Sequence, residues 1–184
     1  MSSFSEKEII EGCIIKNRIV QKILYDMYAP KFYTICLRYV NNKVEADDIL
    51  QEGFLKIFNN ISSFSKENSF EGWMRKIIIN TALSYYKKNK KFYNQVSVEN
   101  IENETFLFEE FDFTQEELLG IIQSLPSGYR TTFNLFAIDG YKHKEIANML
   151  KIDESTSKSQ FFRARKTIQQ KLKELSKEKL TVYG

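Results

Sequence analysis

The sequence predicts an all-α protein built from two small helical domains joined by an acidic linker. Apolar residues recur at helical spacing along most of the chain, which is typical of amphipathic helices. Only 7 Gly and 2 Pro occur among 184 residues, which disfavours a turn-rich β fold. Charge is also segregated along the chain, which indicates separate bodies.

Two basic segments lie on either side of an acidic one. Residues 1–91 hold 15 Lys and Arg against 10 Asp and Glu, whereas residues 92–129 hold no Lys or Arg against 8 acidic residues. Residues 130–184 hold 12 Lys and Arg against 6 Asp and Glu. Basic bodies suit a polyanionic partner. The expected parts are a first domain at 1–93, an acidic linker at 94–113 and a second domain at 114–184.

Composition narrows the class of protein further. Hydrophobic residues make up 42% of the chain, enough for packed cores. The sequence contains no run of 18 apolar residues, so it predicts no membrane span. The N-terminal segment is acidic, unlike a signal peptide. Cys13 and Cys36 lack metal-ligand spacing and fit buried small side chains in a reducing cytoplasm. We expect a cytoplasmic protein with no membrane insertion, no metal site and no cofactor.

Capping signals divide the first domain into helices. Ser5 and Glu8 form a capping box, and Asn17 is suited to cap a second helix. Pro30 should kink or break that second helix. Asn41 and Asn42 mark the next turn.

The helix that follows has a complete apolar stripe and a mixed opposite face. The stripe consists of Ala46, Ile49, Leu50, Gly53, Phe54, Ile57 and Phe58. The opposite face is a candidate interface because it adds an apolar residue to an acidic row, although a lone exposed leucine is common. Its members are Asp47, Asp48, Gln51, Glu52 and Leu55.

A polar loop at 59–68 leads to a long helix that Ser69 should cap. Lysines beside aromatic residues at its end suit single-stranded nucleic acid, but a core helix with a solvated polar face fits equally well. Trp73 lies on the apolar stripe and is expected in the core. The candidates for nucleic-acid contact in the loop and helix are Ser62, Ser63, Phe64, Lys76, Asn80, Ser84, Lys87 and Lys88.

The acidic linker contains several phenylalanines, which are unusual in a plain solvated linker and suggest that it docks. Thr114 and Glu117 form a second capping box, so a new helix should start there. Pro126 marks a break, and the next helix should run from about Gly128 to Gly140.

The most informative stretch, residues 125–165, reads as a helix-turn-helix. Its turn passes through Lys151 and Ile152, and Asp153 is suited to cap the second helix. The predicted inward face of that helix consists of Ser157, Phe161, Ala164 and Ile168. The candidates for DNA contact are Ser155, Thr156, Lys158, Gln160, Arg163 and Arg165. The alternative is an amphipathic hairpin with a solvated basic face.

Three blocks resemble the extracytoplasmic-function (ECF) sigma factors, small bacterial subunits that direct RNA polymerase to promoters. Residues 45–58 read EADDILQEGFLKIF and resemble the family's polymerase-binding helix. Residues 70–91 read FEGWMRKIIINTALSYYKKNKK and resemble its helix for the −10 element. The third block combines LPSGYRTTFNLFAIDGYKHKEIANML with IDESTSKSQFFRARK and resembles its −35 helix-turn-helix, in wording closest to Bacteroidetes members.

The resemblance implies roles for the candidate residues. The mixed face around Asp48 would dock on the β′ clamp helices of core polymerase, and the second domain would meet the β flap. The 59–68 loop would capture a flipped base, and the polar row of the following helix would face the −10 DNA. The basic second helix would read the −35 element, where Arg pairs with guanine and Gln with adenine. An anti-sigma factor is a further implied partner.

Several residues depart from the family pattern. Gly53 replaces a β-branched residue, which should weaken its helix by roughly 1 kcal/mol. Ser84 stands where Asp is common, and Lys142 replaces the usual Ser cap. Lys151 and Ser155 both stand where glycine is common. These departures affect the expected −35 preference rather than the fold.

Two other functions compete with this one. A helix-turn-helix regulator that never binds polymerase would share the second domain, and polymerase binding discriminates between the two. An enzyme is disfavoured, because His143 is the only histidine and no catalytic set or phosphate-binding glycine loop accompanies it. We expect His143 to be a helix-start residue.

Overall fold

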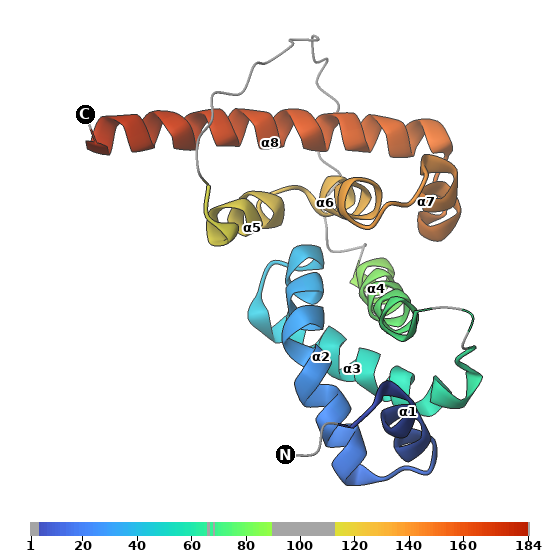
Figure 1. Ribbon diagram of the computed structural model, residues 1–184. Coiled ribbons are helices and arrows are strands. Elements are labelled where there is room, and N and C mark those ends of the chain that lie inside the picture. Colours follow the sequence, from blue (N-terminus) through green and yellow to red (C-terminus); the bar gives the residue numbers. More distant parts are fainter. Residues whose placement is uncertain (1–3, 66, 68, 90–112, 184) are drawn as a thin grey trace. The chain divides into compact units, whose positions relative to one another are not determined.

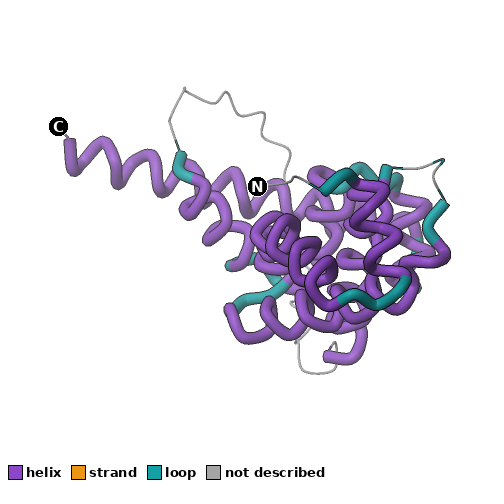
Figure 2. The backbone as a smooth tube through the Cα atoms, turned by 60° about the horizontal axis from the view of Figure 1, so that its bottom comes forward, coloured by secondary structure: helices purple, strands orange, loops and turns teal. Residues whose placement is uncertain are grey.

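The computed structural model describes residues 4–65, 67, 69–89 and 113–183. Within these residues every regular element is helical, and Figure 2 shows helices joined by short loops. The prediction of an all-α fold is therefore confirmed. The chain divides into two compact units, residues 1–86 and 87–184, each described separately below. Most of the acidic linker, residues 94–112, lies outside the described residues.

The first unit contains four α-helices and one short 3₁₀ turn (Figure 1). Both predicted caps are present: the Glu8 amide donates to the Ser5 hydroxyl, and the Asn17 side chain accepts from Ile19 and Val20. Ser69 caps the last helix through the Gly72 amide, at 3.2 Å. The elements are α1 (Glu6–Ile14), α2 (Arg18–Tyr39), α3 (Lys43–Asn60), η1 (Ile61–Ser63) and α4 (Phe70–Asn89).

Of the kink or break predicted at Pro30, the break does not occur, because α2 runs unbroken through it. The kink stays a prediction. Buried residues lie on both sides of the proline, with Leu24 before it and Phe32 and Ile35 after it. Packing of this continuous apolar face against α3 outweighs the hydrogen bond that proline cannot donate.

The core of the first unit forms where α2, α3 and α4 meet. Phe32, Phe54, Met74 and Ile78 are almost completely buried there. Gly53 is also buried, and a Cβ atom at this position would lie 2.4 Å from the Cδ1 atom of Ile78. The glycine therefore permits a close approach of α3 to α4. From the sequence, Gly53 was expected only to weaken its helix.

Both cysteines are buried in this unit, as predicted. Burial raises the pKa of the Cys13 thiol to about 11 and that of Cys36 to about 12. Neither thiol is ionised near neutral pH, so both act as small core side chains.

In the second unit, three short helices line one side of a long one (Figure 1). Thr114 and Glu117 form the predicted capping box at the start of the unit. Leu135, Ile146 and Ala164 form the centre of its core. The elements are α5 (Gln115–Gln123), α6 (Ser127–Phe133), η3 (Asn134–Ile138), α7 (His143–Leu150) and α8 (Glu154–Tyr183).

The helix predicted from Gly128 to Gly140 starts one residue earlier and changes type. It is α-helical to Phe133 and then becomes one π-helical turn, η3. The Asp139 amide donates to the Asn134 carbonyl, five residues back, at 2.9 Å. Such turns insert a residue into an α-helix and re-aim the side chains that follow, a pattern that hydrophobic periodicity does not reveal.

The far end of α8 packs back on the start of the second unit. Lys179 donates to the Glu117 carboxylate at 2.9 Å and lies over the ring of Phe113, 5.3 Å from its centroid. The pKa of Glu117 is lowered, chiefly by the hydrogen bond from Lys179. The tail of α8 thus secures the first turn of α5.

Candidate functional site

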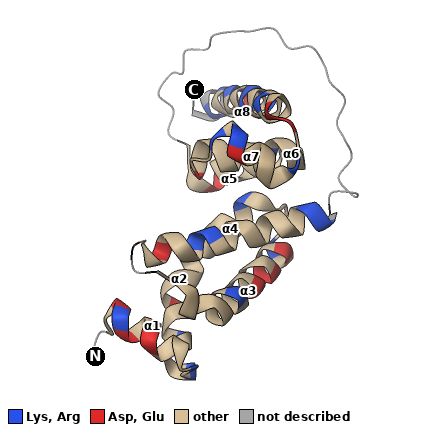
Figure 3. Ribbon diagram, turned by 90° about the vertical axis from the view of Figure 1, so that its right-hand side faces the viewer, with Lys and Arg blue, Asp and Glu red and all other residues tan. Residues whose placement is uncertain are grey.

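The five predicted residues of the mixed face lie together on the exposed side of α3. They are Asp47, Asp48, Gln51, Glu52 and Leu55, and all are exposed. Figure 3 shows acidic residues gathered on α3. Their opposite side carries the buried stripe of the core, so this face is directed away from the packing of the unit.

An exposed valine extends this face, and the sequence reasoning missed it. Val44 is 71% exposed and Leu55 is 62% exposed. With Asp48 and Gln51 they fall at i, i+4, i+7 and i+11, which places all four on one stripe. Two apolar side chains at the ends of a polar acidic row suit a protein partner that presents both basic and apolar groups.

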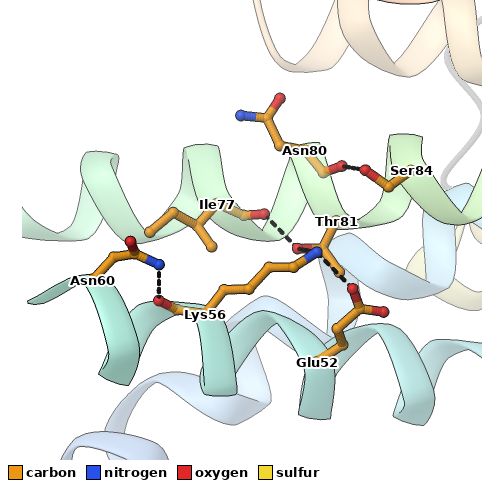
Figure 4. Close-up of polar contacts among 7 residues, drawn as sticks. All are labelled: Glu52, Lys56, Asn60, Ile77, Asn80, Thr81 and Ser84. Atoms are coloured by element: carbon orange, nitrogen blue, oxygen red, sulfur yellow. Dashed lines mark hydrogen bonds and ion pairs between the residues drawn. The ribbon is translucent and has the colours of Figure 1, made fainter.

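Lys56 connects this face of α3 to α4 (Figure 4). Its Nζ lies 2.6 Å from a Glu52 carboxylate oxygen and donates to the Thr81 hydroxyl at 3.3 Å. Thr81 in turn donates to the Ile77 carbonyl at 2.9 Å. This chain of polar contacts fixes α3 relative to α4 beside the acidic face.

The polar row predicted on α4 is exposed along its whole length. Its residues are Lys76, Asn80, Ser84, Lys87 and Lys88. In Figure 4 the Asn80 side chain points away from α3. The Ser84 hydroxyl donates to the Asn80 carbonyl at 2.9 Å, so its proton is used within the helix. Ser84 therefore offers an acceptor to a ligand, where a carboxylate at this position would add a charge.

The three predicted loop residues divide between solvent and an aromatic cluster. Ser62 and Ser63 are exposed in η1, whereas Phe64 is half-buried. The Phe64 ring centroid lies 5.0 Å from that of Phe70 and 5.6 Å from that of Trp73. Trp73 is half-buried rather than fully in the core. The middle of the loop therefore packs on aromatic residues at the start of α4.

On α8, the six predicted residues face in two directions. Ser155, Lys158 and Arg165 are exposed, whereas Thr156, Gln160 and Arg163 are half-buried. Gln160 accepts a hydrogen bond from Thr132, and Arg163 donates one to Tyr129. Gln160 and Arg163 are therefore tied to α6 by side-chain hydrogen bonds, and their contact with DNA stays a prediction.

Two further exposed residues complete the outer face of α8. Ser159 is exposed, and Phe162 is 43% exposed. Together with Ser155 they fall at i, i+4 and i+7, with Lys158 and Arg165 beside them. The candidates chosen from the sequence did not include Phe162, although an aromatic side chain on an otherwise polar helix face is a signal in the sequence.

His143 is the first residue of α7, as predicted, and its role is structural. Its ring stacks on Phe136 with a centroid distance of 4.2 Å, and its Nδ1 lies 3.0 Å from the Ser157 hydroxyl. Burial, followed by the nearby Lys158 ammonium, lowers the pKa of His143 below its ordinary value of 6.5. The Lys142 side chain supplies no cap here, but its amide donates to Glu145 at 2.7 Å.

The described residues offer neither a metal-binding cluster nor a membrane-spanning helix. They contain no group of His, Cys, Asp and Glu able to hold a metal ion. No helix among them is long and apolar enough to cross a membrane.

Comparisons with known proteins agree with the two units. Residues 24–92 match the family model of sigma-70 region 2, and residues 115–168 match that of sigma-70 region 4. The chain is 31% identical over 165 residues to the ECF RNA polymerase sigma factor SigW of Bacillus subtilis, covering 83% of this chain and 88% of the relative.

Two other comparisons extend this result. The chain is 30% identical over 166 residues to the ECF RNA polymerase sigma-E factor of Escherichia coli, covering 83% of this chain and 86% of the relative. Its fold is similar to that of the sigma factor RpoE co-crystallised with the anti-sigma factor NepR from Bartonella quintana. That similarity has a TM-score of 0.51 at 19% identity and covers 83% of this chain and 96% of the other.

The two family-model matches, one in each helical unit, define a transcription factor of the sigma-70 class. The chain belongs to the ECF RNA polymerase sigma factors. It is therefore a subunit that binds core RNA polymerase and directs transcription initiation at specific promoters, and its family is regulatory rather than enzymatic. A helix-turn-helix regulator that never binds polymerase is not favoured.

Proposed function

We propose that this sigma factor uses three separate surfaces to bind core polymerase, the −10 element and the −35 element. The exposed α3 face, from Val44 to Leu55, docks on the β′ clamp helices of core polymerase. The polar row of α4 and the η1 loop receive the −10 element, and the outer face of α8 reads the −35 element. The domain boundaries 1–93, 94–113 and 114–184 belong to the same proposal.

The acidic-apolar stripe on α3 carries the proposal. Its charged and apolar side chains are exposed, while the opposite side of the same helix is fully engaged in the core. Nothing in the packing of the first unit requires Leu55 or Val44 to be apolar. A protein partner that presents both apolar and basic groups explains both.

Charge reversal at the centre of this stripe tests the polymerase contact. We expect Asp48→Arg to abolish co-purification with core polymerase, because the stripe then repels a basic partner. Glu11→Arg is the matched control, since Glu11 is exposed on α1 and undergoes the same change of charge. Retention of core affinity by Asp48→Arg, with both variants folded, would remove the assignment.

The DNA surfaces call for a separate test in the reconstituted holoenzyme. We expect Arg165→Ala to weaken promoter binding through the −35 element, and Asn80→Ala to impair opening or recognition at the −10 element. A promoter lacking its −35 element separates the two, since only the effect of Asn80→Ala should persist on it. An Arg165→Ala holoenzyme with wild-type affinity on the intact promoter would contradict the assignment of α8.

We further propose that the chain acts in the cytoplasm and is held by an anti-sigma factor. The related solved structure from Bartonella quintana contains such a partner. This proposal would be supported by a protein, encoded by a neighbouring gene, that binds the purified chain and blocks its association with core polymerase.

A further inference from the structure

Two hydrogen bonds connect α6 to the helix that we assign to −35 reading. The Thr132 hydroxyl donates to Gln160 Oε1 at 2.7 Å, and Arg163 Nη1 donates to the Tyr129 hydroxyl at 3.3 Å. Tyr129 and Thr132 are three residues apart on α6, and Gln160 and Arg163 are three residues apart on α8. The two bonds therefore lie side by side. They hold two side chains of α8 from the side of the helix that packs on α6.

The two bonds have different chemical consequences. An arginine has five N–H donors, so Arg163 keeps four after bonding to Tyr129. A glutamine carbonyl oxygen has two lone pairs, but that of Gln160 is directed inward, to the hydroxyl of the fully buried Thr132, rather than toward a ligand on the outer side of α8. The amide NH2 of Gln160 is the end that remains for a ligand.

This orientation bears on base recognition. Glutamine pairs with adenine by accepting from N6 and donating to N7, which requires the carbonyl and the NH2 together. An NH2 group alone matches acceptors, and guanine presents two of them in the major groove, N7 and O6. A DNA phosphate oxygen is the other acceptor within the same chemistry.

We propose that Thr132 is a specificity-determining positioning residue that makes Gln160 a donor-only contact. Gln160 therefore favours guanine over adenine at the base it faces, contrary to the adenine pairing expected from its residue type. Thr132 itself does not touch DNA and acts through Gln160. This inference rests on the proposed role of α8 in −35 reading.

The neighbouring threonine provides a matched control. Thr131 is also completely buried, but its hydroxyl makes no hydrogen bond. Thr131→Val and Thr132→Val therefore make the same chemical change at adjacent buried positions of α6. Only the second releases the carbonyl of Gln160.

The experiment uses holoenzyme reconstituted from core polymerase and the full chain. Promoters randomised across the −35 element are selected for binding and sequenced. At one position, we expect Thr132→Val to shift the ratio of adenine to guanine by about fivefold or more toward adenine. Thr132→Ser should restore the wild-type profile, and Thr131→Val should match the wild type in profile and thermal stability.

Gln160→Ala tests the donor claim without altering α6. Loss of a guanine preference at one position indicates a base-edge contact, whereas a uniform loss of affinity across the library indicates a phosphate contact. In the phosphate case, Thr132→Val should also weaken binding uniformly, with rescue by Thr132→Ser. Both results support a donor-only glutamine and differ only in the acceptor.

Two results would overturn the inference. One is a wild-type adenine preference that Gln160→Ala abolishes. The other is a folded Thr132→Val protein whose profile and affinity equal those of the wild type. Arg165→Ala separates these failures from failure of the proposed function, because an Arg165→Ala holoenzyme with wild-type affinity and −35 preference would refute the role of α8 itself.

Discussion

At the residue scale, Gly53 sets the separation of α3 and α4 beside the proposed polymerase-binding face. A side chain here would gain helix propensity, worth about 1 kcal/mol for alanine over glycine. It would also collide with Ile78, whose Cδ1 lies only 2.4 Å from the Cβ position. Ile78 is completely buried, so it has little room to move.

We expect Gly53→Val to lower the free energy of unfolding by about 1–3 kcal/mol, because overpacking outweighs the gain in propensity. Denaturant unfolding of the full chain measures this change. The pair Gly53→Ala and Ile78→Val should be less destabilising than the sum of the single changes, because valine lacks the colliding Cδ1 atom. Gly120→Ala is the control and should stabilise α5, since nothing lies within 4 Å of its Cβ position.

His143 provides the second prediction at this scale. Because its pKa is lowered in the folded state, the unfolded chain binds more protons near pH 6.5. The free energy of unfolding should therefore be fully maintained above this pH and should decrease as the pH falls through it. Denaturant titrations from about pH 7.5 to about pH 5.5 measure the decrease.

The same titration has an internal control. His143 is the only histidine in the chain, so His143→Gln removes all histidine titration from this window. The variant should show a flatter pH dependence than the wild type. An equal slope in both proteins would assign the effect to other groups. Three carboxylates have a pKa that is lowered in the folded state, so their stabilising ionisation is lost only at more acidic pH. They are Glu8, Glu117 and Glu154.

At the element scale, the turn of the helix-turn-helix depends on a left-handed residue. Lys151 ends α7 with φ of 54° and ψ of 55°, and the Ile152 amide donates to the Ala147 carbonyl at 3.1 Å. Glycine is the usual residue at this position of a helix end, because any Cβ is strained there. The departure of Lys151 from the family pattern thus has a measurable cost.

We expect Lys151→Gly to raise the free energy of unfolding by about 0.5–1 kcal/mol, the relief of strain being partly offset by the greater freedom of the unfolded chain. Lys144→Gly is the control, because Lys144 is exposed within α7 and its replacement should cost about 1 kcal/mol. If Lys151→Gly does not raise the free energy of unfolding, the Lys151 backbone is not strained.

Helix ends were predictable where their signals lie within a few residues of one another. The capping boxes at Ser5 and Thr114 and the cap at Asn17 all occur where the sequence placed them. Pro30 and the π-helical turn at Asn134–Ile138 were not predictable in this way. Their outcome depends on packing against other helices, which local patterns do not contain.

At the scale of the whole molecule, two basic segments on either side of an acidic one predict salt-sensitive promoter binding. Each phosphate neutralised by Lys or Arg releases counterions, so the logarithm of the affinity falls linearly with the logarithm of the salt concentration. We expect the double variant Lys87→Gln and Lys88→Gln to reduce this slope by about two in the holoenzyme.

Lys7→Gln with Lys22→Gln is the charge-matched control. Both lysines are exposed and form ion pairs within their own helices, with Glu11 and Asp26, away from the α4 row. This variant should leave the slope unchanged. Equal slopes in both double variants would show that α4 makes no phosphate contacts.

The sequence by itself determined the class of fold, the helix caps, the separation of charge and the family. Each of these depends on neighbours along the chain or on ordered blocks of residues. Only the packing of separate helices decided which polar side chains are exposed and which are held by other helices. The bond from Thr132 to Gln160 spans 28 residues and that from Lys56 to Thr81 spans 25, so both arise only when separate helices pack together. Residue type gives a side chain its donors and acceptors, but packing decides which of them remain free.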